Sequence, residues 1–348
     1  MRPTVLAIGT ANPEHEVLQA QTKDFARGFF AGSLRALDRL LGAFDNTRIA
    51  RRQLARPLPW YAEPHPFHEK NAVYCEAALD LSVRAASEAL QRARIAPTDV
   101  DAIVFVSSTG IRTPSVDGAL VERLGLRRDT ARLPIWGLGC GGGASGLARA
   151  AELVTARRKP VLLVATEICS ATFVHGDRTK ANLIATALFG DGSAAAVLAP
   201  AERGLAVTGS VSQLLEDSED VMGWTVVEQG LRVRFARSIP AIVRAVVPAL
   251  RERAATQVGL GPEAFTRFVL HPGGAKVLEA YEEALGVEPS ALADAYTVLR
   301  EHGNMSAPTV LYVLQQLLGA PPPRPEHGLL LGLGPGFSAE GVTLQWTP

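Results

Sequence analysis

The chain has 348 residues, 47% hydrophobic and 20% charged, so it is long enough for two domains or one large one with an ample core. Lysine plus arginine and aspartate plus glutamate number 35 each. This zero net charge gives no reason to expect a nucleic acid or an acidic membrane surface as a partner.

The cysteine content and the first residues bear on the compartment. The three cysteines, Cys75, Cys140 and Cys169, are an odd and sparse number, which argues against a disulfide framework and for a reducing compartment. The first residues run directly into a predicted strand without a secretory signal, and no apolar run reaches the ~18 residues of a membrane span. We therefore expect a cytoplasmic protein with no membrane span.

In the first half of the chain, short apolar runs alternate with helical stretches. The runs, which are typical of buried parallel strands, cover residues 5–9, 102–107, 133–137, 161–166 and 194–198. The predicted helices cover 76–94, 116–124, 144–156 and 180–189. This alternation predicts an α/β architecture with helices covering a sheet.

The segment 200–204 is the best candidate boundary, and it divides the chain into an N-terminal half, 1–203, and a C-terminal half, 204–348. Beyond it we expect strands at 205–211, 231–235, 265–270, 328–332 and 341–345, and helices at 238–254, 275–285 and 308–318. The halves show no clear sequence repeat, but their common strand–helix order suits a duplicated fold.

Cys140 lies in a glycine-lined turn between an apolar run and a small-residue helix, in the sequence Gly137-Leu-Gly-Cys-Gly-Gly-Gly-Ala-Ser-Gly146. Unpaired amides and the dipole at a helix N-terminus favour a thiolate, and glycines let a substrate carbonyl approach the sulfur. These features predict an activated nucleophile.

Two other junctions supply polar partners for such a nucleophile. His271 follows an apolar run and enters a Pro-Gly-Gly turn, and Asn304 precedes the predicted helix 308–318. Alone, His271 is more typical of a buried structural histidine and Asn304 of a helix cap. Together with a cysteine they provide a nucleophile, a base and a hydrogen-bond donor for acyl-thioester chemistry.

The glycine turn also fits a dinucleotide-binding pattern. Residues 137–142 read G-x-G-x-x-G, and Glu167, at the end of the next strand, could bind a ribose. Against this alternative, the turn follows the third apolar run rather than the first and carries a cysteine where a pyrophosphate would lie. A further alternative is an inert buried cysteine at a closely packed helix. The sequence predicts no metal site, because the other histidines are not paired at metal-ligand spacing. These histidines are His65, His68, His175, His302 and His327.

Six segments, in this order and spacing, resemble the chalcone/stilbene-synthase-like type III polyketide synthases, in particular their bacterial members. The resemblance runs from about Val5 to Thr343, and the segments cover residues 112–115, 137–140, 187–192, 271–274, 303–306 and 332–336. The related initiating ketoacyl-ACP synthases share the Cys, His and Asn. They usually have His-Gln-Ala-Asn in place of the His-Pro-Gly-Gly found here, and they lack the Gly-Pro-Gly loop near the C-terminus.

The resemblance implies a thiolase-like fold, a five-layer α-β-α-β-α sandwich of two similar halves, normally assembled as a homodimer. By motif, Cys140 is the acylated nucleophile, and His271 and Asn304 complete the triad. Phe189 matches the aromatic gate between the CoA tunnel and the reaction cavity, and the second gate falls on Val233, where the plant enzymes have phenylalanine.

Other residues match the family's cavity and CoA site. The cavity-lining matches are Thr109, Cys169, Thr172 and Ser306. The basic segment with Arg48, Arg51 and Arg52 lies where the family binds CoA phosphates, although the lysine pattern is absent. The alternative for this segment is a solvated run of charges.

The implied reaction is an iterative decarboxylative condensation of malonyl-CoA onto an acyl-CoA starter, followed by cyclisation, without a metal, flavin or nicotinamide cofactor. Because Val233 leaves room for a long chain, we expect a fatty acyl starter and a pyrone or resorcinol-type product. The alternatives are a malonyl-primed tetrahydroxynaphthalene-type synthase, an initiating ketoacyl-ACP synthase, a dinucleotide-dependent oxidoreductase and a catalytically idle thiolase-like dimer partner.

Overall fold

The computed structural model describes residues 1–236, 238–319 and 321–347. Within them, nine strands form one mixed sheet. Their order is β11 (Phe265–Leu270), β12 (Glu326–Gly334), β13 (Ser338–Thr347), β8 (Gly204–Leu214), β1 (Arg2–Ala11), β7 (Asp191–Ala201), β6 (Val161–Ile168), β4 (Ala102–Val106) and β5 (Ala131–Ile135).

This sheet consists of two parts that meet at a narrow junction. Strands β1 and β8 pair antiparallel through only two residue pairs, Thr4 with Ala206 and Val5 with Leu205. On one side of the junction β4, β5 and β6 run parallel, and on the other side β11 and β12 do. The chain thus forms two similar α/β halves.

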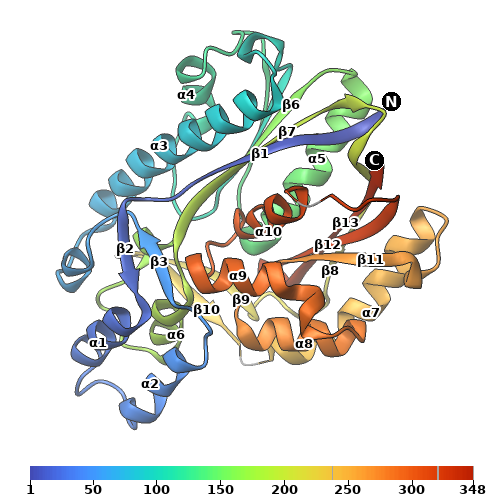
Figure 1. Ribbon diagram of the computed structural model, residues 1–348. Helices are drawn as coiled ribbons and strands as arrows, with labels where there is room; N and C mark the ends of the chain where they lie inside the picture. The colour runs from blue at the N-terminus through green and yellow to red at the C-terminus, as the bar shows by residue number, and fades with distance from the viewer. Residues whose placement is uncertain (237, 320, 348) are drawn as a thin grey trace.

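Helices form three further layers around the two parts of the sheet (Figure 1). Helix α3 (Phe67–Ala93) packs on β1, β6 and β7 from outside, and α7 (Ile239–Gln257) packs on β8 and β13 with α8 (Ala275–Leu285) beside it. Helices α5 (Gly142–Arg157) and α10 (Thr309–Leu318) contact strands of both halves and lie between them. This is the expected five-layer α-β-α-β-α arrangement.

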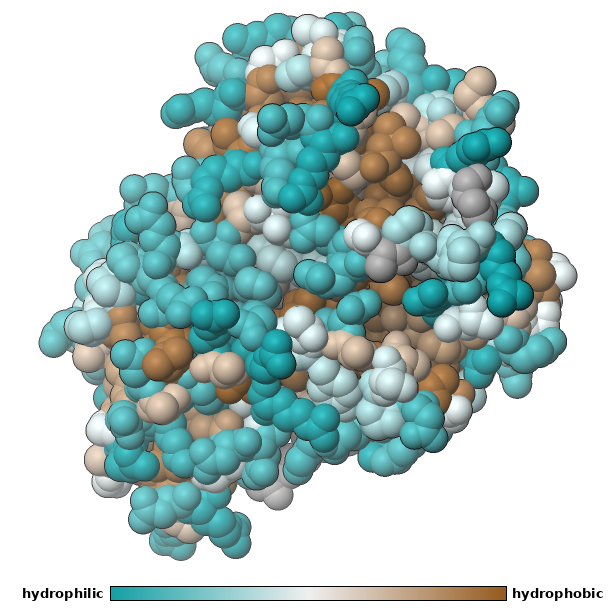
Figure 2. Space-filling model, viewed as in Figure 1, coloured by the Kyte–Doolittle hydropathy of each residue, from teal (hydrophilic) through white to brown (hydrophobic). Residues whose placement is uncertain are grey.

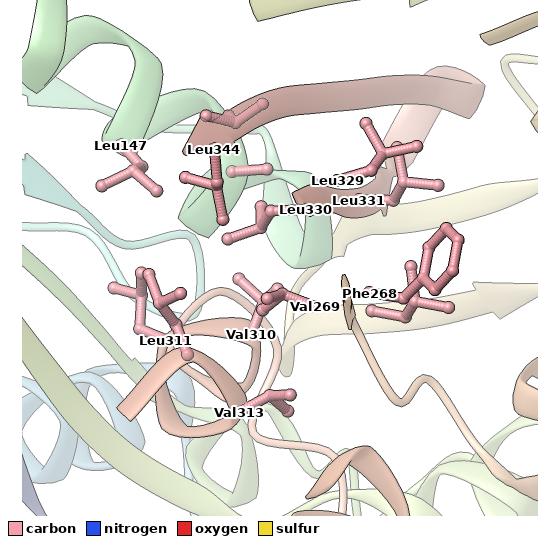
Figure 3. Packing of buried hydrophobic residues seen from close by; sticks show 14 of the residues in the cluster. Leu147, Phe268, Val269, Val310, Leu311, Val313, Leu329, Leu330, Leu331 and Leu344 are labelled. Atoms are coloured by element: carbon pink, nitrogen blue, oxygen red, sulfur yellow. The ribbon is translucent and has the colours of Figure 1, made fainter. Parts of the chain in front are cut away.

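The central layer supplies much of the hydrophobic core. Leu147 of α5 lies close to Leu344 of β13, and Val310 of α10 lies close to Val269 of β11, with Phe268 at one side (Figure 3). All residues of β4 and β6 are buried, as the apolar runs 102–106 and 161–165 predict. Figure 2 shows that hydrophilic residues cover much of one face and that hydrophobic residues reach the surface in separate areas.

A strand was predicted at residues 133–137, and the prediction that it is buried is wrong. This segment enters β5, the last strand of the sheet, and Leu133 and Trp136 are 38% and 56% exposed. A strand at a sheet edge has a neighbour on one side only, so its apolar residues are not enclosed.

Smaller elements surround this framework, and several lack a clear sequence pattern. Helix α3 begins nine positions before the expected residue 76. The remaining strands and helices are β2 (His15–Leu18), α1 (Gln19–Phe29), α2 (Leu37–Asp45), β3 (Arg51–Leu54), α4 (Val116–Arg123), α6 (Lys180–Leu188), β9 (Met222–Val227), β10 (Gly230–Phe235) and α9 (Ala293–His302). Among the described helices, none is long and apolar enough to cross a membrane.

Candidate active site

Cys140 lies where the two halves of the molecule meet. Its short 3-10 turn, Gly139–Gly141, connects β5 to α5 in the N-terminal half, and the Cys140 side chain is buried. The C-terminal half closes over this turn, since a Cβ on Gly332 would lie 3.1 Å from the Cys140 carbonyl oxygen. The nucleophile candidate therefore sits in a site to which both halves contribute.

Asn304 brings its amide to the sulfur from the C-terminal half. The Cys140 Sγ lies 3.9 Å from Asn304 Oδ1 and 4.0 Å from Nδ2. Asn304 Nδ2 also donates to the Gly273 carbonyl at 3.3 Å, and its Oδ1 accepts from the Ser306 backbone amide at 2.8 Å. These bonds fix the amide between the cysteine and the turn that follows His271.

His271 directly follows β11, and its backbone amide donates to the Leu331 carbonyl at 2.9 Å. The ring is buried, and neither ring nitrogen has a hydrogen-bond partner among the described residues. Burial lowers the pKa of His271 to about 3, so the imidazole is neutral at pH 7. A neutral imidazole with free nitrogens can accept a proton.

The thiol of Cys140 does not have the lowered pKa that the helix N-terminus suggested. Burial raises the pKa of Cys140 to about 11, although hydrogen bonds from Ser306 and Asn304 act in the opposite direction. Burial raises the pKa of Cys169 as well. The resting site thus holds a neutral thiol and a neutral imidazole, because desolvation disfavours both charged forms.

Glu167 is a buried carboxyl beside this site that the sequence suggested only as a ribose ligand. It is the last but one residue of β6 and is completely buried, so the ribose-binding role is wrong. Its Oε2 accepts from Thr109 Oγ1 at 2.7 Å and from the Ser108 amide at 2.9 Å, and its Oε1 has no partner among the described residues. Burial raises the pKa of Glu167 to about 7, and its negative charge acts to raise that of Cys140.

Four of the expected cavity and gate residues line one apolar pocket. Phe189, Val233, Cys169 and Thr172 are among its walls. The pocket continues toward α1 and β3 between mostly apolar side chains, including Phe25, Leu54, Leu58, Tyr61 and Phe173. Thr109 and Ser306 are not among these walls; they lie beside Glu167 and Asn304 instead.

Aromatic side chains that the sequence did not single out surround Phe189. Its ring centroid lies 5.6 Å from that of Phe235 and 6.1 Å from that of Trp224. Val233 of β10 pairs across the hairpin with Trp224 of β9. Aromatic bulk is therefore present near Phe189 although Val233 itself is small.

The structure separates the three arginines that the sequence grouped as a CoA-phosphate site. Arg48 and Arg51 are exposed and pair with carboxylates, Arg48 with Glu279 at 3.3 Å and Arg51 with Glu301 at 2.6 Å. Arg52 points inward and is 1% exposed, so the prediction that it binds phosphate is wrong. In β3 successive side chains face opposite sides, which puts Arg51 and Arg52 in different surroundings.

Comparisons with known proteins agree with this architecture. Residues 60–201 match the N-terminal domain, and residues 206–348 the C-terminal domain, of the chalcone and stilbene synthases. The chain is 42% identical to a putative chalcone synthase of Bacillus subtilis (strain 168), with 98% of each chain covered. It is 37% identical to a 1,3,6,8-tetrahydroxynaphthalene synthase of Streptomyces peucetius subsp. caesius, covering 99% of this chain and 93% of the relative.

Among solved structures, the 1,3,6,8-tetrahydroxynaphthalene synthase of Streptomyces coelicolor A3(2), described as a bacterial type III polyketide synthase, superposes with a TM-score of 0.94. It is 30% identical, and the match covers 99% of both chains. The protein is an acyltransferase of the type III polyketide synthase class. More specifically, it belongs to the chalcone and stilbene synthase family, with its relatives above from bacteria.

Proposed function

We propose that the protein loads a fatty acyl group from acyl-CoA onto Cys140, extends it with malonyl-CoA, and releases a cyclised pyrone or resorcinol-type product. The observation that carries this proposal is the contact of Cys140 Sγ with the Asn304 amide, next to the turn of His271 and beside an apolar pocket. In this proposal the starter chain occupies the apolar pocket whose walls include Cys169, Phe25 and Leu58.

In the loading step, His271 acts as a general base. As Cys140 Sγ attacks the thioester carbonyl, its proton moves to the imidazole. The pKa values of the two buried groups oppose this transfer in the resting site, so it accompanies formation of the S–C bond. The new S–C bond forms, the CoA–S bond breaks, and the leaving CoA thiolate takes the proton. Cys140 then holds the acyl group as a thioester.

In the extension step, the bond between the malonyl C2 and its carboxylate breaks, CO₂ leaves, and the electron pair forms a thioester enolate. Asn304 Nδ2 and His271 donate hydrogen bonds to the enolate oxygen, where the negative charge develops. The enolate carbon attacks the Cys140 thioester and expels the thiolate, which leaves a chain two carbons longer on CoA.

A second candidate is supported by the names of two relatives, which are tetrahydroxynaphthalene synthases. In that case the starter is malonyl-CoA itself. Incubation with malonyl-CoA alone, and with acetyl-, hexanoyl- or lauroyl-CoA added, followed by mass spectrometry, separates the candidates. A naphthalene product from malonyl-CoA alone, unchanged by added acyl-CoA, contradicts the fatty acyl proposal.

The variant Cys169→Phe tests the starter pocket. We expect turnover to fall more for lauroyl-CoA than for acetyl-CoA, because each methylene that cannot be buried forfeits about 0.8 kcal/mol. Cys75→Phe adds the same ring outside the pocket as a control, since Cys75 is on α3 and is not among the pocket walls. An equal loss on all starters, with a lower melting temperature, indicates damage to the core instead.

A homodimer is also proposed, with the β5 edge as the contact. Ile111, Leu133 and Trp136 are large apolar residues that are exposed near this edge, and a second copy would remove them from water. Light scattering should give twice the chain mass for the protein and a smaller mass for Trp136→Arg. A monomeric unmodified protein contradicts this assembly.

A further inference from the structure

Arg52 is a buried cation held by the end of a helix rather than by an acid. Its Nη1 donates to the carbonyls of Thr186 and Phe189 at 2.9 and 3.1 Å, and its Nη2 donates to the Ala187 carbonyl at 3.0 Å and to Gln19 Oε1. No carboxylate within the described ranges lies within ion-pair distance of it. The carbonyls at the C-terminus of α6 carry partial negative charge and stabilise the guanidinium there.

The helix end that Arg52 holds is bonded directly to the segment of Asn304. The backbone amide of Asn304 donates to the Leu188 carbonyl at 2.9 Å, and the backbone amide of Gly190 donates to the backbone carbonyl of Asn304 at 3.0 Å. Phe189 and Asn304 therefore face each other in an isolated parallel bridge. The main chain of the proposed enolate-binding residue and that of the proposed gate form one unit.

The side chain of Arg52 also packs against both sides of this bridge. A Cβ on Gly190 would lie 3.3 Å from Arg52 Cβ and 2.4 Å from the His302 carbonyl oxygen. A Cβ on Gly303, which has a φ of 66°, would lie 2.8 Å from the Leu188 carbonyl oxygen and 3.8 Å from Arg52 Cβ. The two backbone segments approach so closely that only glycine fits, and Arg52 covers the place where they meet.

We propose that Arg52 is a positioning residue that sets the distance of the Asn304 side-chain amide from Cys140 Sγ. Through the same bridge it sets the position of Phe189. It does not touch the reacting atoms; it acts through α6 and the bridge. This inference rests on the roles proposed above for Asn304 and Phe189. Its basis is geometric. One guanidinium binds the three carbonyls of residues 186, 187 and 189, and the side chain of Asn304, across the bridge from Phe189, lies against Cys140 Sγ.

The test is Arg52→Lys, which keeps the charge but loses the planar fork. An ammonium has three donors around one nitrogen and cannot reach the same four acceptors, so the bridge shifts. We expect malonyl-CoA decarboxylation per folded protein to fall about 10- to 100-fold, because a displacement near 1 Å has effects of this size. Labelling of Cys140 by iodoacetamide at fixed pH should slow far less, because the Asn304 hydrogen bond is only one of several contributions to the pKa of this thiol.

Arg251→Lys is the matched control. Arg251 also donates to two backbone carbonyls, those of Pro262 and Leu285, at 2.8 and 3.3 Å, but it has no connection to the bridge. If Arg52→Lys changes labelling as strongly as decarboxylation, as a loss of folded protein would, or leaves both unchanged, the proposal is wrong. If Arg52→Lys does not fold, Gln19→Ala removes one acceptor of Arg52 and should lower decarboxylation in the same selective way, though less.

Asn304→Ala, measured in parallel, separates this inference from the proposed function. If Asn304→Ala leaves decarboxylation unchanged, the proposed role of Asn304 fails, whatever Arg52→Lys does. If Asn304→Ala slows it and Arg52→Lys does not, the proposed function stands and the positioning role of Arg52 is refuted.

Discussion

Replacing Glu167 by glutamine should change how the stability of the protein depends on pH. Burial raises the pKa of Glu167 from 4.5 to about 7. Between these two values the folded state holds a proton that the unfolded state has lost, so stability falls as pH rises through this window. A difference of about 2.5 pH units corresponds to roughly 3 kcal/mol, most of which is lost between pH 5 and pH 8.

The variant Glu167→Gln has no such ionisation. Its amide oxygen can still accept from Thr109 and Ser108, while its NH₂ takes the place of the unpartnered Oε1, much as the protonated acid does. We expect the two proteins to differ little at pH 5 and the variant to be more stable by up to about 3 kcal/mol at pH 8.

The assay is urea unfolding of both proteins at several pH values. Other groups that titrate in the same range, such as Asp191, whose pKa burial raises to about 6, occur in both proteins and cancel in the difference. A difference in unfolding free energy that does not vary from pH 5 to pH 8 would refute the reasoning, because Glu167 would then be ionised throughout and stabilised by its hydrogen bonds.

The remaining predictions concern the nucleophile, the enolate and the packing of α5. Cys140→Ser should abolish chain extension in a malonyl-CoA assay. Peptide mapping should find iodoacetamide on Cys140 before Cys169, because Ser306 and Asn304 partly offset the effect of burial on the pKa of Cys140, whereas the charges of Glu167 and Asp191 add to it at Cys169; the reverse order contradicts the assignment. Asn304→Ala should slow malonyl-CoA decarboxylation by roughly 100-fold or more while Cys140 still acylates, and an unchanged rate would leave it only a structural role. Gly143→Ala should lower the urea midpoint, because its Cβ would lie 2.2 Å from the Ala307 carbonyl oxygen; a midpoint equal to that of the parent protein contradicts this contact.

The sequence was informative where a local pattern has one structural meaning. The apolar runs that begin β6 and make up β4 predicted buried parallel strands, and the glycine turn at Cys140 predicted a strand-to-helix junction. The placement of Cys140 beside Asn304 depended on the resemblance of whole motifs, since the two residues are 164 positions apart.

The features that sequence reasoning missed depend on contacts between distant segments. The sequence shows Arg52 in a basic segment, but its burial depends on the carbonyls of a helix more than 130 positions away. The helix N-terminus suggested a low pKa for Cys140, but the effect of burial appears only once the C-terminal half covers the turn. Trp224 follows no clear strand pattern, so its position opposite Val233 could not be predicted.

The assembly of this site from two halves has a consequence for the order of events during synthesis. Cys140 emerges from the ribosome well before Asn304, and at about 5–20 residues per second the delay is roughly 10–30 s. During that interval a folding N-terminal half would lack the amide and the imidazole that we propose for acyl transfer. We therefore expect a nascent chain to be unable to acylate itself from the cellular acyl-CoA pool until its last third has been made and has docked.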